Sequence, residues 1–178
     1  MNAAPKIVTL GCRLNTLESE VMREQLIKAG TPNAVVINTC AVTAEAERQA
    51  RQTIRKLARE NPDARIIVTG CAAQLSPERF AKMAEVDRVV GNAEKLSAVT
   101  LLGNGDGKSI CVSDISTIRE TSGHLVSGLE GRARAFVMVQ QGCDNTCTFC
   151  IIPTARGHNR AVAVDDIVAQ VKKLKNQG

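Results

Sequence analysis

The chain has 178 residues, of which 44% are hydrophobic and 23% are charged. This composition is typical of a globular protein, and it excludes a disordered tail, a collagen-like fibre and a coiled coil. The formal net charge of +5 permits a nucleic-acid partner without requiring one, because a solvated surface can carry the same charge.

The sequence shows no signal for export or membrane insertion. No apolar run approaches the length of about 20 residues that spans a bilayer. The N-terminus lacks the apolar core of a signal peptide. We therefore expect a cytoplasmic protein with no membrane partner. In such a protein the seven cysteines are interpreted as metal ligands or catalytic thiols rather than as disulfides.

Residues 1–112 alternate strand-like and helix-like runs and are expected to form one domain. Asn15 and Glu18, three residues apart, match a capping box that opens the first helix. This alternation predicts an α/β fold: an open, parallel, Rossmann-like sheet whose two faces are covered by helices. Strands are expected at 6–10, 34–38, 65–69, 88–90 and 109–112, and helices from Asn15, over 44–60, from Pro77 and over 94–102.

Residues 113–132 break this alternation. They are rich in Ser, Thr, Gly and charged residues, and we interpret them as an interdomain linker. A strand at 133–140, a loop over 142–160 and a helix over 164–175 are expected to follow. One strand, one loop and one helix are too few to bury a core. Residues 133–178 are therefore expected to be the start of a second domain, truncated in this chain.

Three cysteines in the loop form the pattern C-x-x-x-C-x-x-C, at Cys143, Cys147 and Cys150. This spacing favours three thiolates on one metal cluster. On a four-iron cluster, three cysteines leave one iron open for a substrate or cofactor. A single zinc ion would need a fourth ligand, and His158 is the candidate in the alternative interpretation as a zinc knuckle.

Three further cysteines each follow a predicted strand, at Cys12, Cys40 and Cys71. Ligands of an open parallel sheet gather beyond the carboxyl ends of its strands, so these thiols are expected to meet there as a second three-cysteine site. The alternative is that they are small residues buried at tight strand ends. Cys111 lies inside a strand pattern and is expected to be a buried structural cysteine.

These cysteine motifs resemble those of the methylthiotransferase family of radical S-adenosylmethionine (SAM) enzymes. Four motifs occur in the family's order, at residues 9–15 (TLGCRLN), 38–43 (NTCAVT), 69–74 (TGCAAQ) and 142–157. The first two look like the branch that acts on threonylcarbamoyladenosine in tRNA. Other branches act on isopentenyladenosine in tRNA or on ribosomal protein S12.

The resemblance implies an N-terminal fragment. The family continues through a partial TIM-type barrel and a small RNA-binding domain, and these 178 residues reach only the first βα unit of that radical SAM barrel. We therefore expect little or no activity from this chain alone.

The resemblance also implies cofactors, partners and a reaction. One [4Fe–4S] cluster would cleave SAM, and an auxiliary one would carry the methylthio group to carbon 2 of the adenine. Phe149 would flank the SAM adenine, the alternative being plain packing under the loop. The implied partners are the tRNA anticodon stem-loop, a reductase as electron donor and a sulfur donor. The implied ligands are Cys143, Cys147 and Cys150 for the radical SAM cluster, and Cys12, Cys40 and Cys71 for the auxiliary cluster.

Two other classes of protein remain open. One is a metal-bearing module that binds RNA without chemistry, and the other is a plain α/β domain with incidental cysteines. A helix face of four arginines is consistent with a phosphate-tracking stripe, but we favour a solvated face paired with glutamates. The arginines are Arg48, Arg51, Arg55 and Arg59, and the glutamates are Glu45, Glu47 and Glu60.

Overall fold

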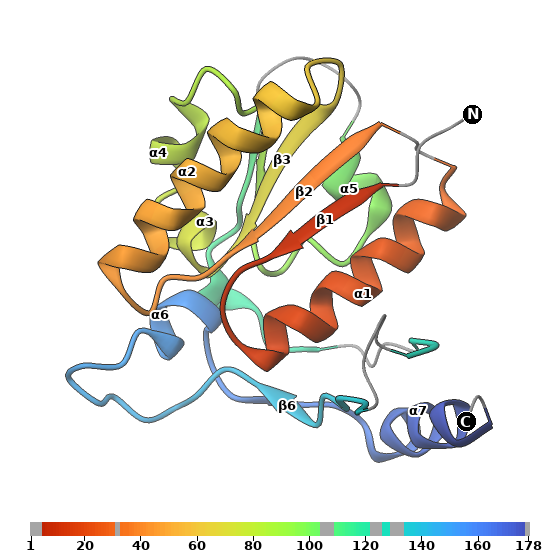
Figure 1. The fold of residues 1–178 in the computed structure, drawn as a ribbon. Coiled ribbons are helices and arrows are strands. Elements are labelled where there is room, and N and C mark those ends of the chain that lie inside the picture. The colour runs from red at the N-terminus through yellow and green to blue at the C-terminus, as the bar shows by residue number, and fades with distance from the viewer. Residues whose placement is uncertain (1–4, 31–32, 104–108, 122–125, 129–133, 177–178) are drawn as a thin grey trace.

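A computed structural model describes residues 5–30, 33–103, 109–121, 126–128 and 134–176 (Figure 1). Its main sheet has five parallel strands in the order β1-β2-β3-β4-β5. The predicted parallel α/β sheet is confirmed, and each strand end lies within one residue of its expected place. The strands are β1 (Lys6–Thr9), β2 (Ala34–Thr39), β3 (Arg65–Gly70), β4 (Arg88–Val90) and β5 (Ser109–Cys111).

Five helices accompany this sheet in the described residues: α1 (Arg13–Lys28), α2 (Ala44–Glu60), α3 (Cys71–Leu75), α4 (Pro77–Ala81) and α5 (Ala98–Leu102). Helix α2 has the predicted bounds, and Pro77 occupies the first turn of α4 as predicted. Helix α5 is shorter than the predicted 94–102, because Ser97 caps it by accepting a hydrogen bond from the Thr100 N–H.

Helix α1 begins at Arg13, so the predicted capping box at Asn15 and Glu18 is wrong. Gly11, with φ of 108°, turns the chain out of β1, and Cys12 takes the N-cap position without a side-chain cap. Asn15 and Glu18 therefore lie inside the helix, and both are buried. A buried polar pair three residues apart has the same sequence spacing as the two residues of a capping box, and the spacing therefore does not distinguish the two.

Apolar layers cover both faces of the sheet. Figure 1 shows α2, α3 and α4 on one side of the sheet and α1 and α5 on the other. Helix α2 packs against the face that carries Val35 and Ile37, and α1 packs against the face that carries Val36 and Ile67. Because the strands follow one another in chain order, the β1–α1–β2 and β2–α2–β3 crossovers have opposite hands, and one departs from the usual right-handed connection. The loops after β1 and β2 therefore leave the carboxyl edge of the sheet toward opposite faces.

Parts of the predicted linker pack against the rest of the molecule. A 3₁₀ helix at Ile115–Thr117 follows β5, and both Ile115 and Val126 are buried. The Gln170 side chain accepts from the Val126 N–H at 2.8 Å and donates to the Val126 carbonyl at 3.0 Å. The Ser127 N–H donates to Glu24 at 2.7 Å. Residues 122–125 and 129–133 lie outside the described residues.

The C-terminal part holds β6 (Gln140–Gln141), α6 (Ile152–Arg156), β7 (Arg160–Ala161) and α7 (Val164–Asn176). Helix α7 confirms the prediction at 164–175. The strand predicted at 133–140 is wrong over residues 134–139, and Ala133 lies outside the described residues. Only Gln140 and Gln141 pair with β7, in antiparallel fashion. The Val139 carbonyl accepts from the Val162 N–H at 2.9 Å, but no other described strand runs beside 134–138, so most of the alternating pattern has no ladder to join. None of the described helices is long and apolar enough to cross a membrane.

Candidate functional site: two cysteine sets and a buried polar cluster

The first cysteine set lies at the carboxyl edge of the sheet, where β1, β2 and β3 end. Cys12 is exposed, Cys40 is buried and Cys71 is partly buried, and all three are free thiols. A Cβ atom added to Gly11 would lie 2.8 Å from the Cys40 Sγ, so only glycine lets the β1 loop approach Cys40 this closely. Cys111, in the edge strand β5, is partly buried, which corrects the expectation of a buried cysteine.

Buried polar side chains hold the strand ends that carry this set. Asn15 donates to the carbonyls of Leu10 at 2.9 Å and Thr39 at 3.0 Å, which lie just before Cys12 and Cys40. Asn38 donates to the Asn15 carbonyl at 3.0 Å, and the Thr39 hydroxyl donates to the Thr69 carbonyl at 2.6 Å. Since an unpaired buried polar group costs about 1–3 kcal/mol, these bonds specify where the loops begin.

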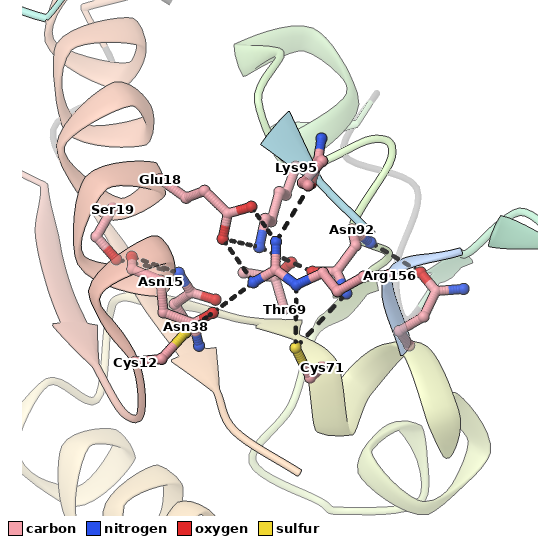
Figure 2. Close-up of polar contacts among 12 residues, drawn as sticks. Cys12, Asn15, Glu18, Ser19, Asn38, Thr69, Cys71, Asn92, Lys95 and Arg156 are labelled. Atoms are coloured by element: carbon pink, nitrogen blue, oxygen red, sulfur yellow. Dashed lines mark hydrogen bonds and ion pairs between the residues drawn. The ribbon is translucent and has the colours of Figure 1, made fainter. Parts of the chain in front are cut away.

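A cluster of charged and amide side chains lies beside Cys71, and we call it the Glu18 cluster (Figure 2). Its members are Asn15, Glu18, Asn92, Lys95 and Arg156. Glu18 is 2% exposed, Lys95 0% and Arg156 4%. Glu18 accepts hydrogen bonds from Lys95 Nζ at 2.6 Å and from Arg156 Nη2 at 2.9 Å, and it also pairs with Arg156 Nη1. Arg156 Nη2 donates to Asn15 Oδ1 at 2.6 Å, and Lys95 donates to Asn92 Oδ1 at 2.8 Å.

The charges of this cluster shift the pKa values of its members. Burial alone raises the pKa of Glu18, but the charges of Lys95 and Arg156 outweigh it, so the pKa is lowered and the carboxylate stays ionised. Burial lowers the pKa of Lys95 to about 8, because Glu18 compensates only in part and Arg156 repels the ammonium. Burial also opposes the charge of Arg156, yet Glu18 more than compensates and its pKa is raised. With Lys95 protonated, two cations share one carboxylate.

The Glu18 cluster connects α6 to the first cysteine set. Arg156 Nε lies 3.3 Å from the Cys71 Sγ, and the Asn92 amide nitrogen lies 3.9 Å from it. The same Asn92 amide donates to the Ala155 carbonyl at 2.7 Å. The Cys12 Sγ lies 3.8 Å from the Asn15 amide oxygen that binds Arg156. Sequence reasoning assigned no site role to Asn92, Lys95 or Arg156, although Arg156 lies within the fourth motif.

The second cysteine set lies on a loop that is fixed mainly at its base. The Cys143 N–H donates to the Gly157 carbonyl at 3.1 Å, and Cys150 N–H donates to the Cys147 carbonyl at 3.0 Å. Gly142 has φ of 77°, and a Cβ there would collide with the His158 carbonyl. The base is thus a close contact between 142–143 and 157–158.

Side chains around this loop are open to solvent. Cys147 is exposed, whereas Cys143 and Cys150 are partly buried. Asp144 accepts from the Asn159 N–H at 3.0 Å and contacts His158 Nδ1 at 3.1 Å, and these hydrogen bonds lower the pKa of Asp144. Phe149 is 91% exposed, so it does not pack under the loop. Its contact with the SAM adenine stays a prediction.

The residues fit iron–sulfur clusters in composition but do not form a ready site for a single metal ion. Within the described ranges, no three His, Cys, Asp or Glu side chains lie together in a way that could hold one ion. His158 Nδ1 contacts Asp144 at 3.1 Å, and the zinc knuckle stays an alternative prediction. A four-iron cluster takes each cysteine on a different iron, so its ligands need not converge on one point. N–H donors on the Cys71 sulfur also suit a metal-bound thiolate.

The arginine face of α2 is a set of surface ion pairs. Arg48 contacts Glu45 at 2.6 Å and Arg51 contacts Glu47 at 2.7 Å, as predicted. Glu60 does not take part in this set; it pairs instead with two lysines, Lys6 and Lys56. Arg55 lies 3.9 Å from Glu85, and the Arg59 side chain donates to the Arg55 carbonyl at 3.3 Å. The solvated-face interpretation therefore holds for Arg48 and Arg51.

Sequence comparison with known proteins identifies relatives of this chain. Residues 5–91 match the family described as "Uncharacterized protein family UPF0004". Over 177 residues the chain is 51% identical to "Threonylcarbamoyladenosine tRNA methylthiotransferase MtaB" of Rickettsia prowazekii (strain Madrid E), covering 99% of this chain and 42% of that protein. The chain is homologous to the MtaB methylthiotransferases. This confirms the resemblance found in the cysteine motifs.

Two further relatives have lower sequence identity to the chain. The MtaB protein of Aquifex aeolicus (strain VF5) is 39% identical over 182 residues, covering 96% of this chain and 44% of that protein. "Ribosomal protein uS12 methylthiotransferase RimO" of Anaeromyxobacter sp. (strain K) is 32% identical over 182 residues, covering 96% of this chain and 38% of that protein. The chain spans 36–44% of the length of the five MtaB relatives compared. The UPF0004 match contains the first cysteine set and ends before the second.

Proposed function

We propose that the chain is part of a radical SAM tRNA methylthiotransferase. The whole enzyme would add a methylthio group to carbon 2 of threonylcarbamoyladenosine next to the anticodon. One observation carries the proposal: the chain is 51% identical, over 99% of its length, to a protein named for that activity. The lower identity of 32% to a uS12 methylthiotransferase makes ribosomal protein S12 the less favoured substrate.

The two cysteine sets have separate tasks in this proposal. Cys12, Cys40 and Cys71 hold the auxiliary [4Fe–4S] cluster, and Cys143, Cys147 and Cys150 hold the radical SAM cluster. When bound, the clusters supply the electron that cleaves SAM and the methylthio group that is transferred. Phe149, exposed next to Cys150, provides a flat apolar surface for the adenine of SAM.

The chain's own polar residues position these ligands. Asn15 fixes the backbone that leads into Cys12 and Cys40 through its bonds to Leu10 and Thr39. Asp144 fixes the loop base next to Cys143 by accepting from the Asn159 N–H. Both contacts fix backbone next to the cysteines that would hold the clusters.

The domain boundaries and partners belong to the same proposal. Residues 1–112 form the N-terminal methylthiotransferase domain, 113–132 the linker, and 133–178 the first βα unit of a radical SAM barrel. The partners are the tRNA anticodon stem-loop, a reductase and a sulfur donor. Because the chain spans only 36–44% of the MtaB relatives, the purified chain should leave tRNA unconverted when its nucleosides are analysed.

The decisive experiment is iron, acid-labile sulfide and zinc per chain after anaerobic reconstitution. Two four-iron clusters give about eight irons in the unaltered chain. Replacing either cysteine set with serine should leave about four irons, whereas Cys111→Ser, the matched control, should change nothing. Zinc without iron would contradict the proposal and favour a metal-bearing binding module. Iron that is unaffected by serine at Cys12, Cys40 and Cys71 would mean that those cysteines are incidental.

A further inference from the structure

We infer that Arg156 is a positioning residue for Cys71 that raises the reduction potential of the cluster bound at the first cysteine set. The inference rests on the proposed function, because it concerns the cluster assigned to Cys12, Cys40 and Cys71. Arg156 belongs to α6, which directly follows the second cysteine set in the chain. The residue thus brings a fixed positive charge from one cysteine segment to the sulfur of the other.

The contact has the geometry of a hydrogen bond to sulfur. Arg156 Nε lies 3.3 Å from the Cys71 Sγ, closer than the Asn92 amide at 3.9 Å. Figure 2 shows the guanidinium between Glu18 and Cys71, so that one side binds the carboxylate and the other the sulfur. Arg156 is 4% exposed, and water therefore does not screen its interaction with the Cys71 sulfur.

Other contacts hold the guanidinium in this orientation. Its Nη2 atom donates to Asn15 at 2.6 Å and to Glu18 at 2.9 Å, and Nη1 also pairs with Glu18. The backbone of α6 is held too, because the Arg156 carbonyl accepts from Arg160 at 2.9 Å. A planar fork bound on both terminal nitrogens cannot rotate freely, so Nε stays directed at the sulfur.

The local charge favours an electron-rich sulfur. Glu18 is the carboxylate shared by Arg156 and Lys95, so one positive charge of this buried group is left uncompensated next to Cys71. A metal-bound thiolate is anionic, and a reduced cluster carries one more negative charge than an oxidised one. Hydrogen bonds to sulfur and nearby positive charge stabilise the reduced form, and both are known determinants of cluster potential.

The test uses the full 178-residue chain with serine at Cys143, Cys147 and Cys150, so that only the first set can bind a cluster. The readout is the midpoint potential of the reconstituted cluster, followed by electron paramagnetic resonance during a redox titration. Arg156→Gln should shift the midpoint to a more negative potential, and Arg156→Lys, which keeps the charge, should restore part of the shift. Arg88→Gln is the control, since Arg88 is a partly buried arginine on β4 that donates to the Thr100 carbonyl at 2.9 Å and is not a member of the Glu18 cluster.

The outcomes separate this inference from the proposed function. No iron in the three-serine chain would overturn both together. Iron retained with an unchanged potential in Arg156→Gln would overturn the inference alone, as would an equal shift in Arg88→Gln. If Arg156→Gln fails to fold, Arg156→Met replaces it, because methionine fills much of the same buried space without a charge or an N–H donor. A negative shift is again expected, and an unchanged potential would overturn the inference.

Discussion

The two cysteine sets of this chain differ in what supports them. The first stands on a five-stranded sheet with apolar layers on both faces, and buried amides and hydroxyls fix its strand ends. The second stands on a loop whose base is held by backbone contacts while Cys147 and Phe149 face solvent. A packed sheet suits a group that must stay in place, and an open loop suits a site that must admit a cofactor. The two regions meet at the Glu18 cluster.

The largest effect is expected where the regions meet. Glu18→Ala leaves Lys95 and Arg156 buried without their shared carboxylate, and should lower the free energy of unfolding by about 3–5 kcal/mol. Urea unfolding followed by circular dichroism measures it. The control Glu20→Ala removes a more exposed carboxylate, 3.2 Å from Arg23 on the same helix, and should cost below about 1 kcal/mol. Equal losses of unfolding free energy in the two variants would mean that the Glu18 cluster does not hold the two cysteine regions together.

Two glycine substitutions distinguish the sheet that carries the first cysteine set from the loop that carries the second. Gly70, with φ of 96°, ends β3, and a Cβ there would collide with the Thr39 backbone. Gly70→Ala should therefore cost about 1–3 kcal/mol of global stability. Gly142→Ala should mainly speed hydrogen exchange at the loop base, with little change in the urea midpoint. Gly30→Ala is the control for φ alone, since its φ is 66° and no atom lies within 4 Å of the added Cβ. A similar fall in midpoint for Gly142→Ala and Gly70→Ala would contradict this contrast.

An effect of similar size to that of Gly70→Ala is expected from pH, through the Lys95 of the Glu18 cluster. The pKa of Lys95 is about 8 in the folded chain against its ordinary value of 10.5. Between these values the unfolded chain binds more protons, so the free energy of unfolding should rise with pH across this window. Below pH 8 both states are protonated and the penalty of burying the charge is fully present. Lys95→Met should remove this rise, and urea midpoints of the two proteins that run parallel across the window would contradict the assignment.

The smallest effect is expected on α2, away from both cysteine sets. Arg48 and Glu45 form an exposed pair, so Arg48→Ala should leave the urea midpoint and the iron content per chain unchanged. Arg51→Ala provides the comparison, because Arg51 is less exposed and its partner Glu47 also binds Arg79 at 2.6 Å. A larger fall in the urea midpoint for Arg48→Ala than for Arg51→Ala would contradict the interpretation of this helix face as a solvated surface.

The sheet was predictable because its information is local. Val35, Ile37 and Ile67 belong to short β-branched runs, and each run ends at a Thr-Cys or Gly-Cys pair that marks the start of a loop. The placement of the first cysteines at strand ends followed from the same runs. The 134–138 segment has an equally strand-like pattern but no neighbouring strand among the described residues. A ladder needs two strands, and a pattern in one segment reports only one of them.

The Glu18 cluster was not predictable because its information is distant. Arg156 lies 138 residues after Glu18 and 85 residues after Cys71. No periodicity marks such a contact, and the three-residue spacing of Asn15 and Glu18 matched a helix cap instead. Lys95 and Asn92 lie before the short helix α5 with no pattern that separates them from surface residues. The only available signal was that Arg156 belongs to the motif that carries the second cysteine set.

The same separation in sequence has a consequence for the order of assembly during synthesis. Ribosomes add about 5–20 residues per second, so Arg156 is made about 4–17 s after Cys71. Lys95 is made earlier, and Glu18 can pair with it while the rest of the chain is still being extended. For that interval Cys71 exists on the nascent chain without the arginine that later contacts its sulfur. The surroundings of the Cys71 thiol are therefore set by time along the growing chain as well as by position in the finished fold.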